Sequence, residues 1–409
     1  MPASSGRVAF QYPNFRRYIA SRVLTTTASE MQALAVAWQV YGITHRPLDL
    51  GLVGLAQFLP GILLFLVAGH AADRFSRRHI LQVCCAGFSL CSLLLLGLSL
   101  HGISSVFPIY AVLLMNGTVR AFNAPAGQAL APLLVAPEHF PNAVAWNSSV
   151  FQAATIAGPI VGGMVYGITG SPTVVYICAA AEYLGALGLF SAISLPAVNR
   201  PASAASPRMA LEGLRYIWRD KLILGAISLD LFAVLLGGAV ALLPVYAREI
   251  LHVGAFGLGV LRSAPGLGAV VMSMVVAHWP LRRNAGAAML WCVCGFGLFT
   301  IVFGLSRSLP LSLVALVLVG ACDTVSVIVR HTLIQLSTPD QMRGRVSAVN
   351  VVFIGASNEV GQFESGLTAH WFGTVPAVVL GGIGTIAIVA IWAWRFVELR
   401  NVHELVRTV

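Results

Sequence analysis

Charged residues are scarce in this chain of 409 residues, and that scarcity excludes an ordinary water-soluble protein. Only 10% of the residues are Asp, Glu, Lys or Arg, whereas 57% are hydrophobic. A soluble globular domain carries about 25% charged residues, because its surface has to face water. The composition therefore indicates a chain whose solvent is lipid.

Catalytic and metal-binding motifs are also missing. The sequence contains no HExxH, no GxSxG and no GxxxxGK(S/T) loop, which argues against a membrane enzyme and against ATP hydrolysis. The seven cysteines lie in apolar runs without zinc-type spacing to histidines, so we expect packing residues, no metal site and no cofactor. The net charge of +10 is divided among short clusters without a long basic stripe, which does not point to nucleic acid.

Long apolar segments are what the sequence does contain. A transmembrane helix needs about 20 such residues. We expect an all-α membrane protein with twelve transmembrane helices. They lie near residues 17–42, 50–72, 79–100, 107–133, 143–168, 173–195, 222–247, 256–279, 285–306, 309–335, 346–371 and 375–397.

Basic residues give these segments an orientation. Eighteen Lys and Arg residues lie at the termini and in the loops on one side, whereas the opposite loops hold only Arg46, Arg248 and Arg307. Positively charged loops stay in the cytoplasm. We therefore expect a multi-pass protein of the bacterial inner membrane with both termini in the cytoplasm.

The chain divides into two halves around a linker. The segment Leu195–Ser206 (LPAVNRPASAAS) is rich in Pro, Ala and Ser and opens the longest cytoplasmic loop. We expect an amino-terminal six-helix bundle at 1–195, a cytoplasmic linker at 196–220 and a carboxy-terminal six-helix bundle at 221–409.

The two halves carry an internal repeat. Residues Gly54, Pro60 and Gly61 recur as Gly259, Pro265 and Gly266 after 205 residues, and Ala145 and Asn147 recur as Ala348 and Asn350 after 203 residues. Glycine and proline recur by chance in many membrane proteins, but several matches in register favour a duplication. Duplicated halves are typical of secondary transporters, whose substrate site lies between them near the bilayer midplane.

Two motifs carry a resemblance to a known family. The segment 69–78 (GHAADRFSRR), with Gly69, Asp73, Arg74, Arg77 and Arg78, resembles the loop signature GxxxD(R/K)xG(R/K)(R/K) of the major facilitator superfamily. Ser76 departs from it, because glycine is usual there and permits a tight turn. The resemblance implies the major facilitator fold of two pseudo-symmetric six-helix bundles and a gating role for this loop.

The second motif lies in the fifth span. Gly158, Pro159, Gly162 and Gly163 resemble the GPxxGG element of the superfamily's exporters, where glycines let helices approach closely. More narrowly, segments 121–126, 338–346 and 357–366 resemble the bacterial branch of enterobactin exporters and secretion effectors.

Charged residues inside the spans are candidate functional residues, because a charge near the bilayer centre costs at least a few kcal/mol. In the superfamily the first, fourth, seventh and tenth helices line the central cavity, and here they carry Glu30, Arg120, Asp230 and Asp323. We expect Glu30 and Arg120 to face each other and to bind or orient substrate, while Asp230 or Asp323 carries a proton. Buried ion pairs that only fix helix packing are the alternative.

Three further charges complete the candidate site. Arg330 follows Asp323 by two helical turns, about 10 Å along the helix, so we expect it nearer the cytoplasmic mouth and no arginine at the level of the two acids. Glu359 and Glu364, in the eleventh span, point about 140° apart and should have different partners. Glu182, in the sixth span, has no role assigned.

These observations favour a secondary transporter that works by alternating access. The leading hypothesis is proton-coupled export, by antiport, of a small organic molecule such as a drug or siderophore, by a monomer in the lipid bilayer. Proton-coupled uptake of a small metabolite is the alternative. A receptor or assembly partner without transport is disfavoured by the charges at mid-span.

Overall fold

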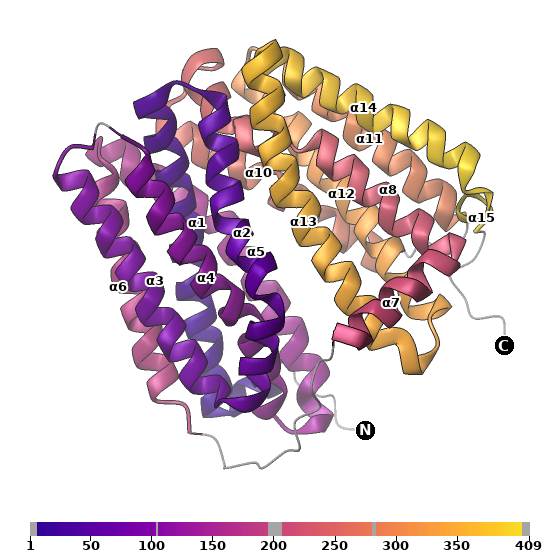
Figure 1. Ribbon diagram of the computed structural model, residues 1–409, viewed down its shortest axis with the longest axis horizontal. Coiled ribbons are helices and arrows are strands. Elements are labelled where there is room, and N and C mark those ends of the chain that lie inside the picture. Colours follow the sequence, from indigo (N-terminus) through magenta and orange to yellow (C-terminus); the bar gives the residue numbers. More distant parts are fainter. Residues whose placement is uncertain (1–5, 104, 195–206, 280–283, 403–409) are drawn as a thin grey trace. The chain divides into compact units, whose positions relative to one another are not determined.

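The computed structural model describes residues 6–103, 105–194, 207–279 and 284–402, and these residues are almost entirely helical, without a strand (Figure 1). The chain divides into two compact units. Unit 1 comprises residues 1–44, 56–205 and 255–259, and unit 2 comprises residues 45–55, 206–254 and 260–409.

Unit 1 is a bundle of long helices. Helix α1 packs against α5 and α6, and α3 packs against α4 and α6. Phe15, Tyr18 and Phe190 are buried in its core. The helices are α1 (Pro13–Thr44), most of α2 (Pro47–Arg74), α3 (Arg77–Leu100), α4 (Phe107–Leu130), α5 (Phe140–Thr169) and α6 (Pro172–Ser191), with the short η1 (Val8–Gln11), η2 (Ala131–Leu133) and η3 (Pro137–His139).

Unit 2 is built in the same way. Helix α11 packs against α12 and α14, and α8 packs against α13 and α14. Leu229, Met289 and Val329 are buried between them. The helices are α7 (Pro207–Arg219), α8 (Lys221–Gly237), η4 (Ala239–Leu242), α9 (Leu243–Val245), η5 (Tyr246–Ile250), most of α10 (Gly254–His278), α11 (Ala285–Leu305), α12 (Leu309–Ser337), α13 (Asp340–Phe372), α14 (Thr374–Arg395) and α15 (Val397–Arg400).

Nine helical segments of the described residues are long and apolar enough to cross a membrane. They are Pro47–Leu64, Arg77–Leu100, Pro137–Thr169, Pro172–Ser191, Lys221–Ile250, Gly254–His278, Ala285–Leu305, Leu309–Ser337 and Thr374–Arg395. The helices α1, α4 and α13 also coincide with expected spans, but they are more polar, and they carry Glu30, Arg120, Glu359 and Glu364. The count of twelve spans therefore stays a prediction.

Close glycine contacts recur in the two halves of the sequence at the spacing of the repeat. In unit 1, a Cβ on Gly163 of α5 would lie 3.1 Å from Gly259 Cα in the first turns of α10. In unit 2, a Cβ on Gly366 of α13 would lie 2.9 Å from Gly51 Cα in the first turns of α2. Gly163 and Gly366 are 203 residues apart, as in the repeat, whereas the repeat equivalent of Gly259 is Gly54, three residues beyond Gly51. The two contacts therefore join equivalent helices but are displaced by about one turn along α2.

A second pair of contacts has the spacing of the repeat on both of its sides. Gly158 of α5 lies against α1, where its Cβ would be 2.7 Å from Glu30 Cβ. Gly361 of α13 lies against α8, where its Cβ would be 3.1 Å from Leu235 Cα. Gly158 and Gly361 are again 203 residues apart, and Glu30 and Leu235 are 205 residues apart. Contacts that recur in this way are what a duplicated sequence would produce.

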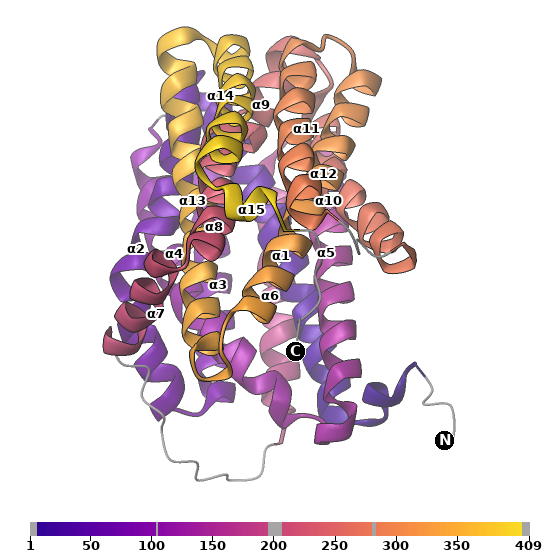
Figure 2. The same ribbon diagram turned by 90° about the vertical axis from the view of Figure 1, so that its right-hand side faces the viewer.

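Two regions differ from the expected elements. The linker expected at 196–220 contains a helix, α7, which packs beside the amino-terminal end of α13 (Figures 1 and 2). The seventh span, expected as one helix over 222–247, is interrupted after Gly237 by η4 and ends in the π-helical turn η5. Gly238 is the residue at the break, with φ −74° and ψ 65°.

Candidate functional site

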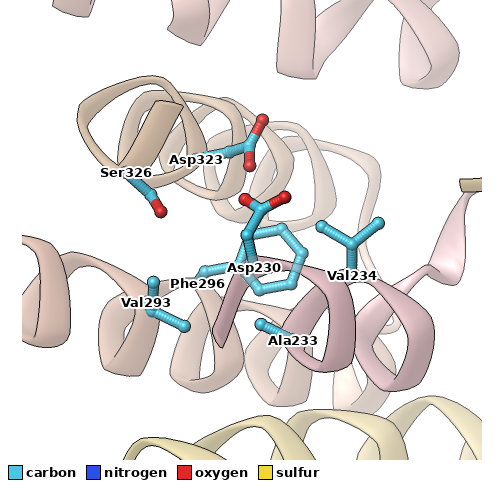
Figure 3. Close-up of a pocket in the computed structure, with 7 residues that line it drawn as sticks. All are labelled: Asp230, Ala233, Val234, Val293, Phe296, Asp323 and Ser326. Carbon is cyan, nitrogen blue, oxygen red and sulfur yellow. The ribbon is translucent and has the colours of Figure 1, made fainter. Parts of the chain in front are cut away.

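A small pocket in unit 2 brings together charged residues from two helices. Its cavity volume is about 10 Å³, close to what one water molecule needs. Figure 3 shows the carboxyl groups of Asp230, from α8, and Asp323, from α12, pointing toward each other. The lining residues are Asp230, Ala233, Val234, Val293, Phe296, Asp323 and Ser326.

Asp230 is paired with an arginine. Arg330 of α12 forms an ion pair with it through Nη1 and Oδ2. Arg330 is 1% exposed and Asp230 is 5% exposed. The expectation that no arginine reaches the level of the two acids is therefore wrong, because the height of α8 relative to α12 brings Asp230 to the guanidinium.

Asp323 has no such partner among the residues that the structure describes. Among the ion pairs of the described residues, none joins a basic side chain to Asp323. With Arg330 charged and both acids ionised, the three side chains carry a net charge of −1. One proton on Asp323 would bring the group to neutrality, which suits an environment where an uncompensated charge is costly.

Ser326 is a pocket residue that the sequence alone did not single out. Its side chain is 2% exposed, and its hydroxyl has no hydrogen-bond partner. It follows Asp323 by three residues, so the two lie on the same face of α12. That spacing to a charged residue at mid-span is the signal by which it could have been found. The pocket thus contains two carboxyl groups and a hydroxyl in an otherwise apolar wall.

The first-half candidates lie in unit 1. Glu30 of α1 is partly buried against Gly158, and Arg120 of α4 is exposed. Each of them takes part in an interaction, but the expected pairing between them stays a prediction. Another basic group in this unit is Arg22. Its guanidinium lies over the Phe151 ring, 5.7 Å from the ring centre. Such a cation–π contact stabilises a cation in a low-dielectric environment.

Acids on α13 have local hydrogen-bond partners. Thr368 Oγ1 donates to Glu364 Oε1 at 2.7 Å, and Gln362 Nε2 donates to Glu359 Oε2 at 3.3 Å. The two acids thus have different partners, as their angular separation predicts. Glu182 of α6 has one buried carboxylate oxygen without a hydrogen-bond partner.

The segment that resembles the family's loop signature joins α2 to α3. Gly69 and Arg74 lie in the last turns of α2, as does the backbone of Asp73, whose side chain lies outside the described part of the structure. Ser76 precedes α3 with φ −60° and ψ 118°. Any residue adopts that conformation, so the turn does not need the glycine that is usual there.

Basic residues after this turn hold the end of a neighbouring helix. Arg77 and Arg78 begin α3, and Arg78 Nη2 donates to the Ser191 carbonyl oxygen at 2.6 Å. Arg17 Nη1 donates to the Ala192 carbonyl oxygen at 2.5 Å. Carbonyl groups at a helix carboxyl end lack partners within the helix and attract cations. The two arginines therefore fix the end of α6.

The GPxxGG element brings α5 close to α1 and to the first turns of α10, which belong to unit 1. A Cβ on Gly162 would lie 2.9 Å from Met31 Cα of α1, and the Pro159 carbonyl faces Gly259 of α10. At Gly158, Gly162 and Gly163 the neighbouring helices are so close that a side chain on α5 would have no room. The motif therefore serves close helix packing, as its composition predicts.

The structure combines long apolar helices, packing contacts that recur in the two halves, and charged residues in the middle of helices. These features are typical of a multi-pass membrane transport protein of the major facilitator type. A family model described as transmembrane secretion effector matches residues 4–407, and the chain belongs to this family. The family and the relatives below identify a transporter and not an enzyme.

Curated relatives and solved structures agree with this assignment. The chain is 25% identical over 399 residues to the enterobactin exporters of Shigella dysenteriae serotype 1 and Escherichia coli strain K12, a match that covers 96% of this chain and 94% of theirs. A mutant of the nucleoside transporter NupG is 11% identical with a TM-score of 0.74, and the match covers 94% of this chain and 100% of that one. A bacterial homologue of the human lysosomal transporter Spinster is 14% identical with a TM-score of 0.71, over 95% and 96%. The two structures show the fold.

Proposed function

We propose that this transporter is a proton-coupled exporter of a small organic molecule, and that Asp323 is the proton carrier. The observation that carries the proposal is the charge balance of the pocket in unit 2. Asp230 and Arg330 neutralise each other, while Asp323 lines the same pocket and forms no ion pair with a basic side chain of the described residues. Protonation of one carboxyl group therefore switches this group of charges between −1 and 0.

Such a switch can drive alternating access. A conformation that encloses the pocket favours its neutral form, because burial of an unpaired charge is costly. A conformation that opens the pocket to water tolerates the charged form. Proton binding and release then shift the equilibrium between the two conformations by as much as the proton's binding free energy differs between them.

The substrate of this proposal is a small organic molecule such as a siderophore or a drug. The family relationship to enterobactin exporters supports this class, and it supports export as the direction. The pocket itself has room for about one water molecule, so it is too small for the substrate. We place substrate binding at Glu30 and Arg120, on α1 and α4.

The protein is proposed to act as a monomer in a bacterial inner membrane, with twelve spans in two six-helix halves and both termini in the cytoplasm. The asymmetry of basic residues supports this orientation, and the repeat supports the two halves.

Transport by purified protein in liposomes tests the proposal. We expect iron-free enterobactin to accumulate when the lumen is more acidic than the outside, because outward proton movement then drives the substrate inward by antiport. Accumulation with an alkaline lumen would instead demonstrate symport and uptake. Protein-free liposomes are the control, and accumulation that is insensitive to the gradient in both directions would contradict proton coupling.

We also propose that the loop with Gly69, Asp73, Arg74, Arg77 and Arg78 is a gate that stabilises closure on one side. Asp73→Asn should then slow turnover by roughly tenfold or more and leave the melting temperature nearly unchanged. The reason is that a polar residue at the end of a helix contributes little packing. A wild-type transport rate in both Asp73→Asn and Arg77→Ala would refute the gate.

A further inference from the structure

We infer that the exposed face of α7 is a binding site for anionic lipid headgroups. Leu211 and Trp218 are 65% and 66% exposed on this helix, and Arg215 and Arg219 are also exposed. At 100° per residue these four side chains fall within an arc of about 100°. One face of α7 therefore combines two guanidinium groups with two apolar side chains.

The opposite face of α7 is fixed in unit 2. Ile217 is 1% exposed and packs in a cluster with Ile223, Ile334 and Val346. Tyr216 donates a hydrogen bond to the Ser337 carbonyl oxygen at 3.3 Å. These contacts come from α8, α12 and α13, so they determine which side of α7 faces outward.

The contact with α13 is close and polar. A Cβ on Gly213 would lie 2.8 Å from the Arg345 carbonyl oxygen, so α7 lies directly against the backbone of α13. Glu212 is paired with Arg345 at 2.6 Å. The acid nearest the exposed face is thereby already neutralised, which leaves that face with the positive charge of Arg215 and Arg219.

The position of α7 in the chain places this face at headgroup depth. Asp220 follows α7 directly, and its carboxylate accepts hydrogen bonds from the backbone N–H groups of Leu222 and Ile223 at the start of α8. The apolar span Lys221–Ile250 begins at that point. A helix that ends where a span begins must lie at the membrane surface, where Trp is favoured and where arginines meet lipid phosphates.

Lipid phosphate is the ligand that this chemistry fits. Guanidinium groups bind phosphate through two parallel hydrogen bonds, while Trp218 and Leu211 can insert among the acyl chains beside it. The inference concerns lipid binding, and it does not depend on which acid carries the proton or on the transported substrate.

Binding of phosphatidylglycerol to purified protein in detergent tests the site. We expect native mass spectrometry to retain phosphatidylglycerol more strongly than phosphatidylcholine on the wild-type protein. Each basic residue near an anionic surface is worth about a fivefold change, so R215Q/R219Q should bind phosphatidylglycerol roughly thirtyfold more weakly. R215K/R219K should keep most of the affinity, and R395Q/R400Q, which removes two exposed arginines elsewhere, should weaken binding much less than R215Q/R219Q does.

A second measurement does not require the arginine variants to fold. Brominated phosphatidylglycerol quenches a nearby tryptophan, so it should quench wild-type fluorescence more than that of Trp218→Phe, and 0.5 M salt should reduce the difference. Equal retention of phosphatidylglycerol by wild type and R215Q/R219Q, or equal quenching of wild type and Trp218→Phe, would overturn the inference.

Discussion

At the scale of single residues, the buried pair of Asp230 and Arg330 makes a prediction about stability. Removing one partner of a buried ion pair leaves an uncompensated charge, at a cost of about 3–5 kcal/mol. Asp230→Asn should therefore lower the free energy of unfolding by about that amount. D230N/R330M, which removes both charges, should recover much of the loss. Chemical denaturation of the purified protein measures both, and a wild-type midpoint for Asp230→Asn would contradict the pairing.

Asp323 should behave differently, because no basic side chain in the described part of the chain forms an ion pair with it. We expect Asp323→Asn to unfold at nearly the wild-type temperature and to lose transport driven by a pH gradient. Substrate counterflow without a gradient should remain, since it needs alternating access but no proton exchange. Gradient-driven transport by both Asp323→Asn and Asp230→Asn would exclude the pocket as the proton site and would make Glu359 or Glu364 the leading candidate.

The sequence predicts these residues better than it predicts their arrangement. Asp230, Asp323 and Arg330 are identifiable as rare charges within apolar runs, since such charges are costly in lipid. Their pairing depends on how far α8 is shifted along α12, and neither helix encodes that shift in its own sequence. The seven-residue spacing of Asp323 and Arg330 placed the arginine about 10 Å away along α12. It could not show that Asp230 approaches from the other helix.

At the scale of helices, the close contact of α5 with α10 gives a test with a matched control. Gly163 faces the Ala255 carbonyl oxygen, 2.6 Å from an added Cβ, whereas an added Cβ on Gly167 would be 3.6 Å from Phe256 Cβ, an ordinary contact. Gly163→Ala should lower stability by about 1–3 kcal/mol through overpacking. Gly167→Ala, one turn further along α5, should leave it within about 0.5 kcal/mol, apart from a small gain in helix propensity. Thermal unfolding of the two variants in detergent distinguishes them, and equal melting temperatures would contradict the contact.

Helices could be located from the sequence wherever an apolar run is long enough to cross a membrane. Helix α7 was missed because it follows a segment rich in Pro, Ala and Ser and is too short and polar for a span. Its amphipathic pattern becomes interpretable only when Gly213 and Ile217 are seen against α13 and α8. The break after Gly237 was missed because hydropathy does not respond to backbone conformation, and the residues on both sides are apolar.

At the scale of the whole molecule, the orientation in the membrane can be tested with single cysteines. In a variant without the seven native cysteines, an impermeant thiol reagent added to intact cells should label Ser105→Cys, between α3 and α4, and should spare Leu211→Cys, on α7. The expectation follows from the asymmetry of basic residues between the two sides. Labelling of Leu211→Cys in intact cells together with protection of Ser105→Cys would reverse the topology.

The contact between Gly51 and Gly366 sets the order in which the newly made chain can reach its final packing. The first turns of α2 belong to unit 2, although they leave the ribosome about 300 residues before the part of α13 against which they pack. At about 5–20 residues per second, that interval lasts roughly 15–60 s. During this time Gly51 and its neighbours lie in the membrane without their permanent contact. The first turns of α2 can therefore reach their final packing only after the last third of the protein has been synthesised.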